Sequence, residues 1–303
     1  MAGPTYNPLR RESDAPARRQ LRKGMYLLPS LLTAANIAAG YYAILQTLQG
    51  SVAEAWHFDH AAKAIGFAVL FDGLDGRIAR MTNTSSDFGR ELDSLADVIA
   101  FGVAPAVLAW TWGFRLLPFI GYGDVPPWIS LESSDLRVKL VQLGIIASFV
   151  FLTAGASRLA RFNITKNPQP SNPGRPGRKY FVGMPIPGGA GVVAAVVHFT
   201  RGQPVTWWWL SITWGALIVA ISFLMVSTWR FPSFKDIDLR RRHPFRNFIL
   251  IGAVFAAIWF YSQFVLFVMA LAYMLSGVLL RLMYALRRRP AGSAPPPIPQ
   301  TQE

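Results

Sequence analysis

Residues 71–102 read FDGLDGRIARMTNTSSDFGRELDSLADVIAFG, a stretch that carries six carboxylates inside a chain that is otherwise strongly apolar. Asp72 and Asp75 are three residues apart, and Asp93 and Asp97 are four apart. These spacings place side chains on one face of a helix. The polar segment between the two pairs ends in glycine, which is typical of a turn between antiparallel helices. The stretch therefore predicts a helical hairpin in which four aspartates converge.

The rest of the chain is typical of a membrane protein. Of its 303 residues, 52% are hydrophobic and only 15% are charged. Apolar runs of about 20 residues recur, and a helix of that length crosses a bilayer. We predict an all-α integral membrane protein with eight transmembrane helices, the last two formed by dividing a run too long for one crossing. The predicted spans are residues 26–48, 61–81, 93–114, 140–162, 184–200, 207–228, 247–261 and 263–285.

The formal charge of +14 comes from basic residues that flank the predicted spans. Alternate connections are rich in Lys and Arg, so the positive-inside rule predicts that both termini and the carboxylate stretch face the cytoplasm. Nucleic-acid binding is not expected, because these residues do not form a single stripe. The chain has no cysteine, which excludes disulfides and thiolate metal sites. Its four histidines are scattered, so no histidine metal site is predicted.

Three regions follow from the composition. Residues 1–24 are polar and basic and are predicted to form a disordered cytoplasmic arm. Residues 25–286 form the predicted membrane catalytic domain. Residues 287–303 are rich in proline and are predicted to be a disordered tail.

The converging aspartates predict a divalent metal site. Four carboxylates in a small volume repel one another, so a positive partner is required. Ligation by carboxylate oxygens is the preference of hard cations, and Mg²⁺ or Mn²⁺ is commonly shared with substrate phosphates. Two such ions fit the charge of four aspartates. Gly76, Ala79 and Gly89 leave room for a ligand near the backbone, and Arg80 offers a guanidinium suited to phosphate.

The segment DGLDGRIARMTNTSSDFGRELDSLAD resembles the signature of the CDP-alcohol phosphatidyltransferases. The eight matching positions are Asp72, Asp75, Gly76, Ala79, Arg80, Gly89, Asp93 and Asp97. The resemblance implies the fold of that family and a membrane enzyme that displaces CMP from a CDP-linked lipid with an alcohol. It further implies that all four aspartates bind two divalent ions and that Asp97 is the general base. The residues implied to bind the CDP nucleotide and its phosphates are Asp75, Gly76, Ala79, Arg80 and Gly89.

Other segments indicate which alcohol is used. LPSLLTAANIAAGYYAI, ASRLARFN, YFVGMPIPGGAG and LMVSTWRFPSFK resemble parts of bacterial phosphatidylserine synthases. This resemblance implies CDP-diacylglycerol and L-serine as substrates, a homodimer, and a bacterial cytoplasmic (inner) membrane with the active site facing the cytoplasm. Arg158 and Arg161, on one helical face, and Asn163 are candidates to bind the serine carboxylate or a lipid phosphate. Asn36 in the first span is a further possible hydrogen-bonding residue.

Several alternatives stay open from the sequence. Within the family, the acceptor could be glycerol 3-phosphate or inositol phosphate, which would favour a more basic pocket. From another class, a cation transporter would place clustered aspartates along an ion path. It would need carboxylates deep in the bilayer, whereas these are expected near the cytoplasmic surface. A noncatalytic scaffold is the third alternative.

Overall fold

The computed structural model describes residues 15–82, 87–117, 133–165, 171, 180–232 and 244–287. Within these ranges it leaves undescribed the side chains of residues 15–30, 75–77, 79–82, 133–135, 244–248, 250, 251 and 287. The elements in chain order are α1 (Ala15–Gln49), α2 (Trp56–Thr82), α3 (Asp87–Asp97), η2 (Val98–Val103), α4 (Ala104–Trp110), η3 (Thr111–Arg115), α5 (Ser133–Ile164), β1 (Tyr180–Val182), α6 (Ile186–Phe199), α7 (Trp208–Val226), β2 (Arg230–Pro232) and α8 (Pro244–Arg287).

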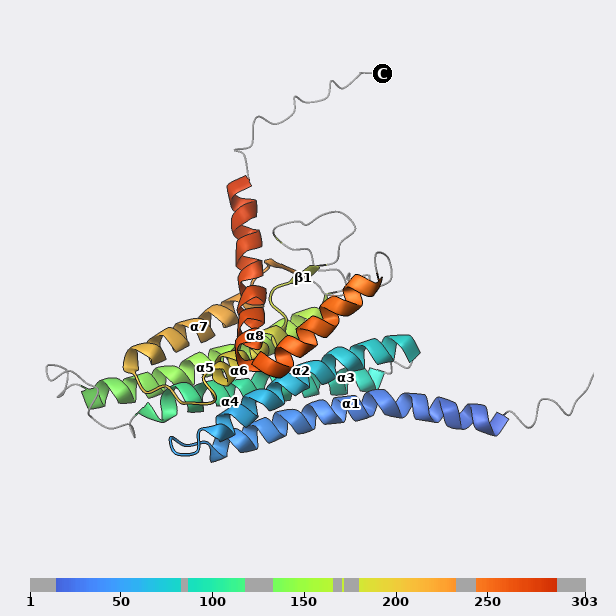
Figure 1. The fold of residues 1–303 in the computed structure, drawn as a ribbon, viewed down its shortest axis with the longest axis horizontal. Coiled ribbons are helices and arrows are strands. Elements are labelled where there is room, and N and C mark those ends of the chain that lie inside the picture. Colours follow the sequence, from blue (N-terminus) through green and yellow to red (C-terminus); the bar gives the residue numbers. More distant parts are fainter. Residues whose placement is uncertain are drawn as a thin grey trace, which may run out of the picture.

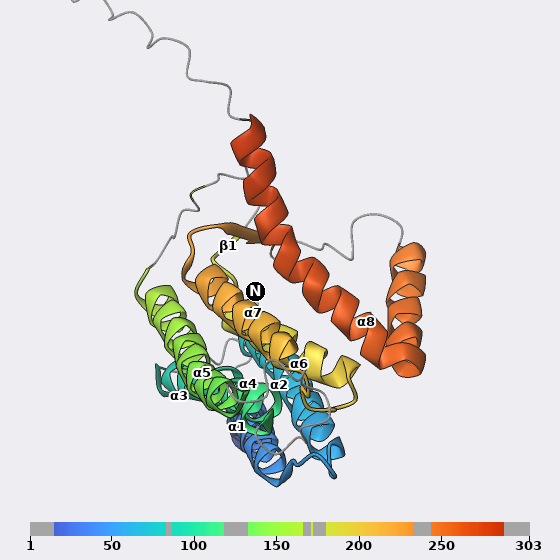
Figure 2. The same ribbon diagram turned by 90° about the vertical axis from the view of Figure 1, so that its left-hand side faces the viewer.

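Helices α1, α2, α5 and α7 extend in roughly the same direction and form the body of the molecule (Figure 1). Seen from its end, this body is a cluster with α4 among the other helices, while the long α8 lies along one side (Figure 2). The segment from α3 through η2 and α4 to η3 is continuous, and the π-helical turns η2 and η3 widen it locally. It brings the second half of the carboxylate stretch into the bundle.

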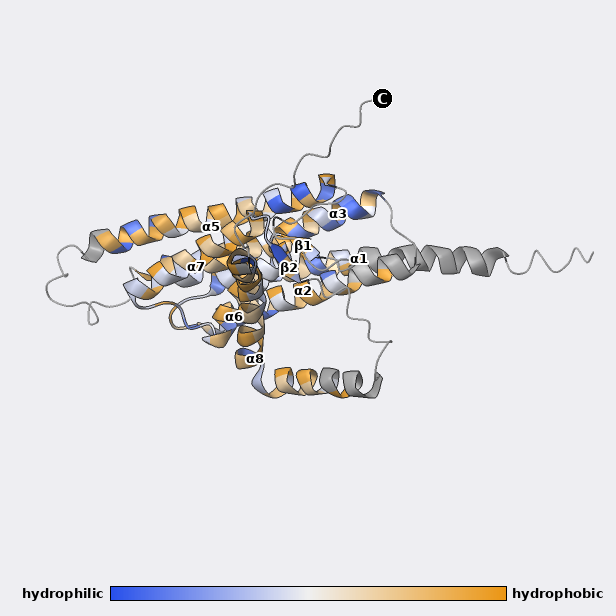
Figure 3. Cartoon of the chain, turned by 90° about the horizontal axis from the view of Figure 1, so that it is seen from above, coloured by the Kyte–Doolittle hydropathy of each residue, from blue (hydrophilic) through white to orange (hydrophobic). Residues whose placement is uncertain are grey.

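Five helices of the described chain are long and apolar enough to cross a membrane. Their apolar segments are Leu31–Gln49, Asp87–Arg115, Leu136–Ile164, Trp208–Val226 and Gly252–Leu286. Hydrophobic residues run along much of α5 and α7, whereas α3 carries hydrophilic ones (Figure 3). The predicted helical membrane architecture is therefore found, but the count of eight spans and the cytoplasmic termini stay predictions. Helix α1 begins inside the predicted N-terminal arm, and residues 1–14 and 288–303 lie outside the described chain.

Helix α8 is broken at Tyr261, where φ is −134° and ψ is 40°. This break coincides with the division that the sequence predicts between residues 261 and 263. The part of α8 after the break lies across the direction of α1, α2 and α5 (Figures 1 and 2). The two parts of α8 therefore meet at an elbow instead of continuing one rod.

A small antiparallel sheet, absent from the predicted all-α fold, joins two connecting segments. Strands β1 and β2 pair with Phe181 opposite Phe231. Phe231 is fully buried. Gly183 follows β1 with φ +75°, and a Cβ there would lie 2.6 Å from the carbonyl oxygen of Met225. Only glycine fits this turn, and strands of three residues are too short to show an alternating pattern in the sequence.

Close packing of small residues holds α1 against the segment that follows α3. A Cβ at Gly40 would lie 2.8 Å from the Cα of Ala100 in η2. Helix backbones approach this closely only where small residues face each other. Larger apolar side chains complete the core, among them the fully buried Phe101 and Phe151. This contact fixes α1 beside the aspartates of α3.

Candidate active site

Three of the four signature aspartates meet between α2 and α3. Asp72 comes from α2, and Asp93 and Asp97 come from successive turns of α3. One carboxylate oxygen from each lies within 4.8 Å of the others. Asp72 and Asp93 are half-buried, and Asp97 is 9% exposed. The fourth aspartate, Asp75, lies on α2, and its side chain is outside the described residues.

This geometry suits a divalent ion. Oxygen ligands about 2.1 Å from one Mg²⁺ lie at most about 4.2 Å apart, so carboxylates within 4.8 Å need only small side-chain rotations to share an ion. The donors are all oxygens, which is the set that Mg²⁺ and Mn²⁺ prefer. The three aspartates are therefore compatible with a divalent metal site.

The surroundings of the aspartates are only partly described. Gly76, Ala79 and Arg80 lie on α2 by their backbone, but their side-chain positions are outside the described residues. Gly89 lies in the first turn of α3 and is half-buried. A Cβ at Gly73, next to Asp72, would meet no atom within 4 Å. Open space therefore adjoins Asp72 on the exposed side of α2.

Arg158 is a buried cation close to the aspartates. It lies near the end of α5, is 6% exposed, and its guanidinium packs 5.4 Å from the ring centre of Phe162. It interacts electrostatically with Asp97 and Asp72. No ion pair or hydrogen bond of its guanidinium is found within the described part of the chain. A buried guanidinium of this kind is a good binding group for an anionic ligand.

Arg161 makes a different set of contacts. Its guanidinium donates hydrogen bonds to the carbonyl oxygens of Val226 at 2.9 Å, Ser227 at 3.3 Å and Met225 at 3.5 Å. These carbonyls end α7, and the last carbonyls of a helix lack partners within it. Arg161 therefore caps α7 and ties it to α5.

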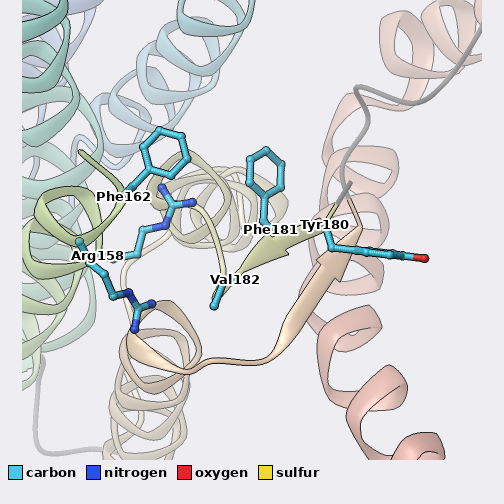
Figure 4. Close-up of a pocket in the computed structure, with 6 residues that line it drawn as sticks. Arg158, Phe162, Tyr180, Phe181 and Val182 are labelled. Carbon is cyan, nitrogen blue, oxygen red and sulfur yellow. The ribbon is translucent and has the colours of Figure 1, made fainter. Parts of the chain in front are cut away.

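The two arginines line one pocket at the end of the bundle. Its other walls are Phe162 from α5 and the residues of β1, Tyr180, Phe181 and Val182. Phe162, Phe181 and Val182 lie around Arg158, while Tyr180 is directed away from it (Figure 4). The β1 residues were not among the predicted site residues. They carry no charge that would mark them in the sequence.

Two asparagines also lie near the site. Asn163 is exposed, and its amide donates to the hydroxyl of Ser94 on α3 at 2.9 Å, which joins α5 to the aspartate-bearing helix. Asn36, on α1 one turn before Gly40, is 1% exposed. Neither its amide nitrogen nor its oxygen has a hydrogen-bond partner among the described residues. The two N–H donors and the acceptor oxygen of its amide are thus unsatisfied within the described part of the chain.

Comparison with known sequences identifies the family. The profile of the family described as CDP-alcohol phosphatidyltransferase matches residues 26–219, which include every signature position. This chain belongs to the CDP-alcohol phosphatidyltransferase family. The matched range includes the three aspartates that meet between α2 and α3. Together with its apolar helices, this membership makes the chain a multi-pass membrane protein.

Several curated proteins are similar to this chain over most of their length. A CDP-diacylglycerol–serine O-phosphatidyltransferase of Helicobacter pylori (strain ATCC 700392 / 26695) is 35% identical over 76% of this chain and 82% of its own. The protein of that name from Bacillus subtilis (strain 168) is 34% identical over 70% of this chain and 93% of its own. An archaetidylserine synthase of Methanothermobacter thermautotrophicus is 31% identical over 68% of this chain and 69% of its own.

Proposed function

We propose that this chain is a phosphatidylserine synthase that transfers the phosphatidyl group of CDP-diacylglycerol to the hydroxyl of L-serine and releases CMP. The observation that carries the proposal is the meeting of Asp72, Asp93 and Asp97 in a chain of this family. The names of the relatives described above share serine, whereas the lipid group is phosphatidyl in two and archaetidyl in one. Serine is therefore the better supported acceptor.

Asp72, Asp75, Asp93 and Asp97 are proposed to hold two divalent ions, Mg²⁺ or Mn²⁺. When bound, such ions neutralise phosphate oxygens and stabilise a leaving phosphate. The chain contributes the oxygen ligands and their spacing. Gly76, Ala79, Arg80 and Gly89, with Asp75, are proposed to bind the CDP nucleotide and its phosphates.

Asp97 is proposed as the general base. A serine hydroxyl is a weak nucleophile at neutral pH, so a nearby carboxylate must accept its proton as it attacks phosphorus. Asp97 is the most buried of the three described aspartates. Its position restricts the access of water, which would otherwise compete with serine as the nucleophile. The bond formed joins the serine oxygen to the lipid-side phosphorus, and the bond broken is the one to CMP.

Arg158 is proposed to bind the serine carboxylate. Its guanidinium is buried, lies beside the pocket and interacts with the charges of Asp97 and Asp72. An anion held by Arg158 would therefore lie near the proposed base. Arg161 and Asn163 are further candidates for this role, and each also links two helices. A lipid phosphate is the other anion that this pocket could take.

The membrane setting completes the proposal. The site faces the cytoplasm of a bacterial inner membrane, where serine and CMP are soluble and the acyl chains of the donor stay in lipid. The functional unit is a homodimer. The basic loops next to the predicted spans support this orientation.

A panel of acceptors tests the proposed activity. Purified protein in lipid micelles is given CDP-diacylglycerol, Mn²⁺ and one of L-serine, glycerol 3-phosphate or inositol phosphate, and CMP is measured. We expect rapid CMP release with L-serine only, and none with Asp97→Asn. Preference for a phosphorylated alcohol would reject serine while keeping the family reaction. Ion flux in liposomes without CMP formation would support a transporter instead.

A further inference from the structure

A second polar cluster lies far from the signature aspartates. Asp59 on α2, His198 on α6 and Ser262 on α8 form a chain of hydrogen bonds. The carboxylate oxygen Oδ1 of Asp59 lies 2.5 Å from Nδ1 of His198, and Nε2 of His198 lies 2.9 Å from the hydroxyl oxygen of Ser262. Asp59 precedes Asp72 by thirteen residues on α2, which corresponds to about 20 Å along the helix. The two clusters are therefore separate sites.

The acidic end of this cluster is held firmly. The second oxygen of Asp59, Oδ2, lies 2.7 Å from the ammonium nitrogen of Lys63. Burial raises the pKa of Asp59, but the hydrogen bonds and charges of His198 and Lys63 outweigh it and the pKa is lowered from its ordinary 3.8. The carboxylate is thus ionised at neutral pH. It fixes the imidazole so that Nδ1 faces Asp59 and Nε2 faces Ser262.

The imidazole itself is well packed. His198 is 5% exposed. The rings of Phe199 and Phe267 stack at 4.4 Å and hold the end of α6 against α8, and the guanidinium of Arg201 donates to the side chain of Gln263 at 3.3 Å. These contacts keep the base and the hydroxyl at a fixed separation.

Ser262 occupies a position suited to a nucleophile. It follows Tyr261, whose backbone breaks α8, and it is partly exposed. A helix that restarts at Ser262 has N–H groups in its first turn that lack partners within the helix. Such groups, beginning with Gln263, can stabilise negative charge on an oxygen next to the serine.

We propose that Asp59, His198 and Ser262 form a catalytic triad that cleaves carboxylic esters. The arrangement of nucleophile, base and orienting acid is the one that activates serine on unrelated folds. The Ser262 oxygen attacks the ester carbonyl carbon as its proton passes to Nε2 of His198, and the alcohol leaves with that proton. Water then gives a proton to His198 and attacks the acyl-serine, which releases a carboxylic acid and restores Ser262.

The surface around Ser262 indicates the class of ester. Trp259, Phe260, Tyr261 and Phe264 are all more than half exposed, with Trp259 at 86%. These aromatic side chains next to the elbow favour a substrate with a long apolar chain. An acyl ester of a lipid has that chemistry, and its acyl chain would contact the aromatic residues while its carbonyl reaches Ser262.

An alkyl fluorophosphonate, which reacts covalently with activated serines, tests the triad. Full-length protein in detergent micelles is labelled, and the modified peptide is identified by mass spectrometry. We expect labelling at Ser262, none in Ser262→Ala, and a labelling rate at least about 100-fold lower in His198→Gln. Ser276→Ala is the matched control and should label normally, because among the described residues the Ser276 hydroxyl donates only to the carbonyl of Tyr273 on the same helix.

Turnover of a long-chain p-nitrophenyl ester gives a second readout. Wild-type protein should release nitrophenol, and Ser262→Ala should not. Both proteins should still form CMP at the aspartate site. Retained CMP formation shows that the variants are folded. A wild-type protein that is never labelled and never cleaves the ester overturns the proposal, even if Ser262→Ala lowers thermal stability. Labelling of Ser262 and cleavage of the ester are expected whichever alcohol is the acceptor at the aspartate site.

Discussion

The two polar clusters of this molecule differ in the charges that they bring together. Around Asp59 the chain itself supplies the balancing groups, since Lys63 and His198 both contact the carboxylate. Between α2 and α3 the chain instead gathers three like charges within 4.8 Å. Carboxylates held close together repel one another, and a bound cation relieves this repulsion. The first cluster is therefore an ion-paired network of the described residues, whereas the second gathers the oxygen ligands that the proposed metal site requires.

The largest expected effect comes from removing a charge from the aspartates between α2 and α3. Asp97→Asn should lower the rate of CMP release at least about 1000-fold, because both the proposed base and one metal ligand are lost. The rate is measured with saturating CDP-diacylglycerol and L-serine.

Asp87→Asn is the matched control for this substitution. Asp87 lies in the first turn of the same helix, is highly exposed and pairs only with Arg90 among the described residues. It should retain nearly full activity. Equal losses in the two variants would show that any charge change on α3 is damaging, and would remove the case for Asp97.

Removing the ions should have a similar but reversible effect. We expect EDTA to abolish CMP formation and Mn²⁺ or Mg²⁺ to restore it. In Asp93→Asn, the Mn²⁺ concentration for half-maximal activity should rise about tenfold or more, because one oxygen ligand is replaced by a weaker one. An unchanged metal requirement in this variant would place Asp93 outside the metal site.

Substitutions of Arg158 and Arg161, which line the same pocket, are expected to have different effects. Arg158→Gln should raise the KM for serine about 10- to 100-fold with a smaller change in the KM for CDP-diacylglycerol, because a charge-assisted contact to the carboxylate is lost. Arg161→Gln should instead lower the temperature of unfolding, since it removes the cap of α7. Steady-state kinetics and thermal unfolding of both variants distinguish these roles. A reversed pattern would exchange the roles of the two arginines.

The aspartate hairpin could be predicted from the sequence because the residues that form it lie close together along the chain. Asp93 and Asp97 are one helical turn apart, and only the short segment 83–86 separates α2 from α3. The different contacts of Arg158 and Arg161 could not be predicted, because two residues three apart lie on the same helical face. Only the contact of Arg161 with the end of α7, 65 residues along the chain, separates them.

Features formed by segments that are distant along the chain also could not be predicted from the sequence. Strands β1 and β2 are three residues long and come from connections that follow α5 and α7. His198 was one of four histidines read as scattered, since its partners at positions 59 and 262 are found only when α2, α6 and α8 pack together. The break of α8, in contrast, was predictable, because its apolar run exceeds the thickness of a bilayer.

The smallest expected effect concerns the packing that positions the aspartates. Gly40→Ala should destabilise the protein by about 1–3 kcal/mol, because its Cβ would lie 2.8 Å from a backbone atom of Ala100. Gly66→Ala on α2 is the control, since a Cβ there meets no atom within 4 Å. Thermal unfolding compares the two. Equal stability of both variants would show that the α1 contact with η2 is loose.

Binding of Mn²⁺, followed by electron paramagnetic resonance on the purified protein with CDP-diacylglycerol, is the most direct test of the metal site. It needs no catalytic turnover. We predict about two bound ions per chain, and a marked loss of binding in Asp72→Asn and Asp93→Asn but not in Asp87→Asn. Equal Mn²⁺ binding by all four proteins would contradict the assignment of these aspartates as metal ligands.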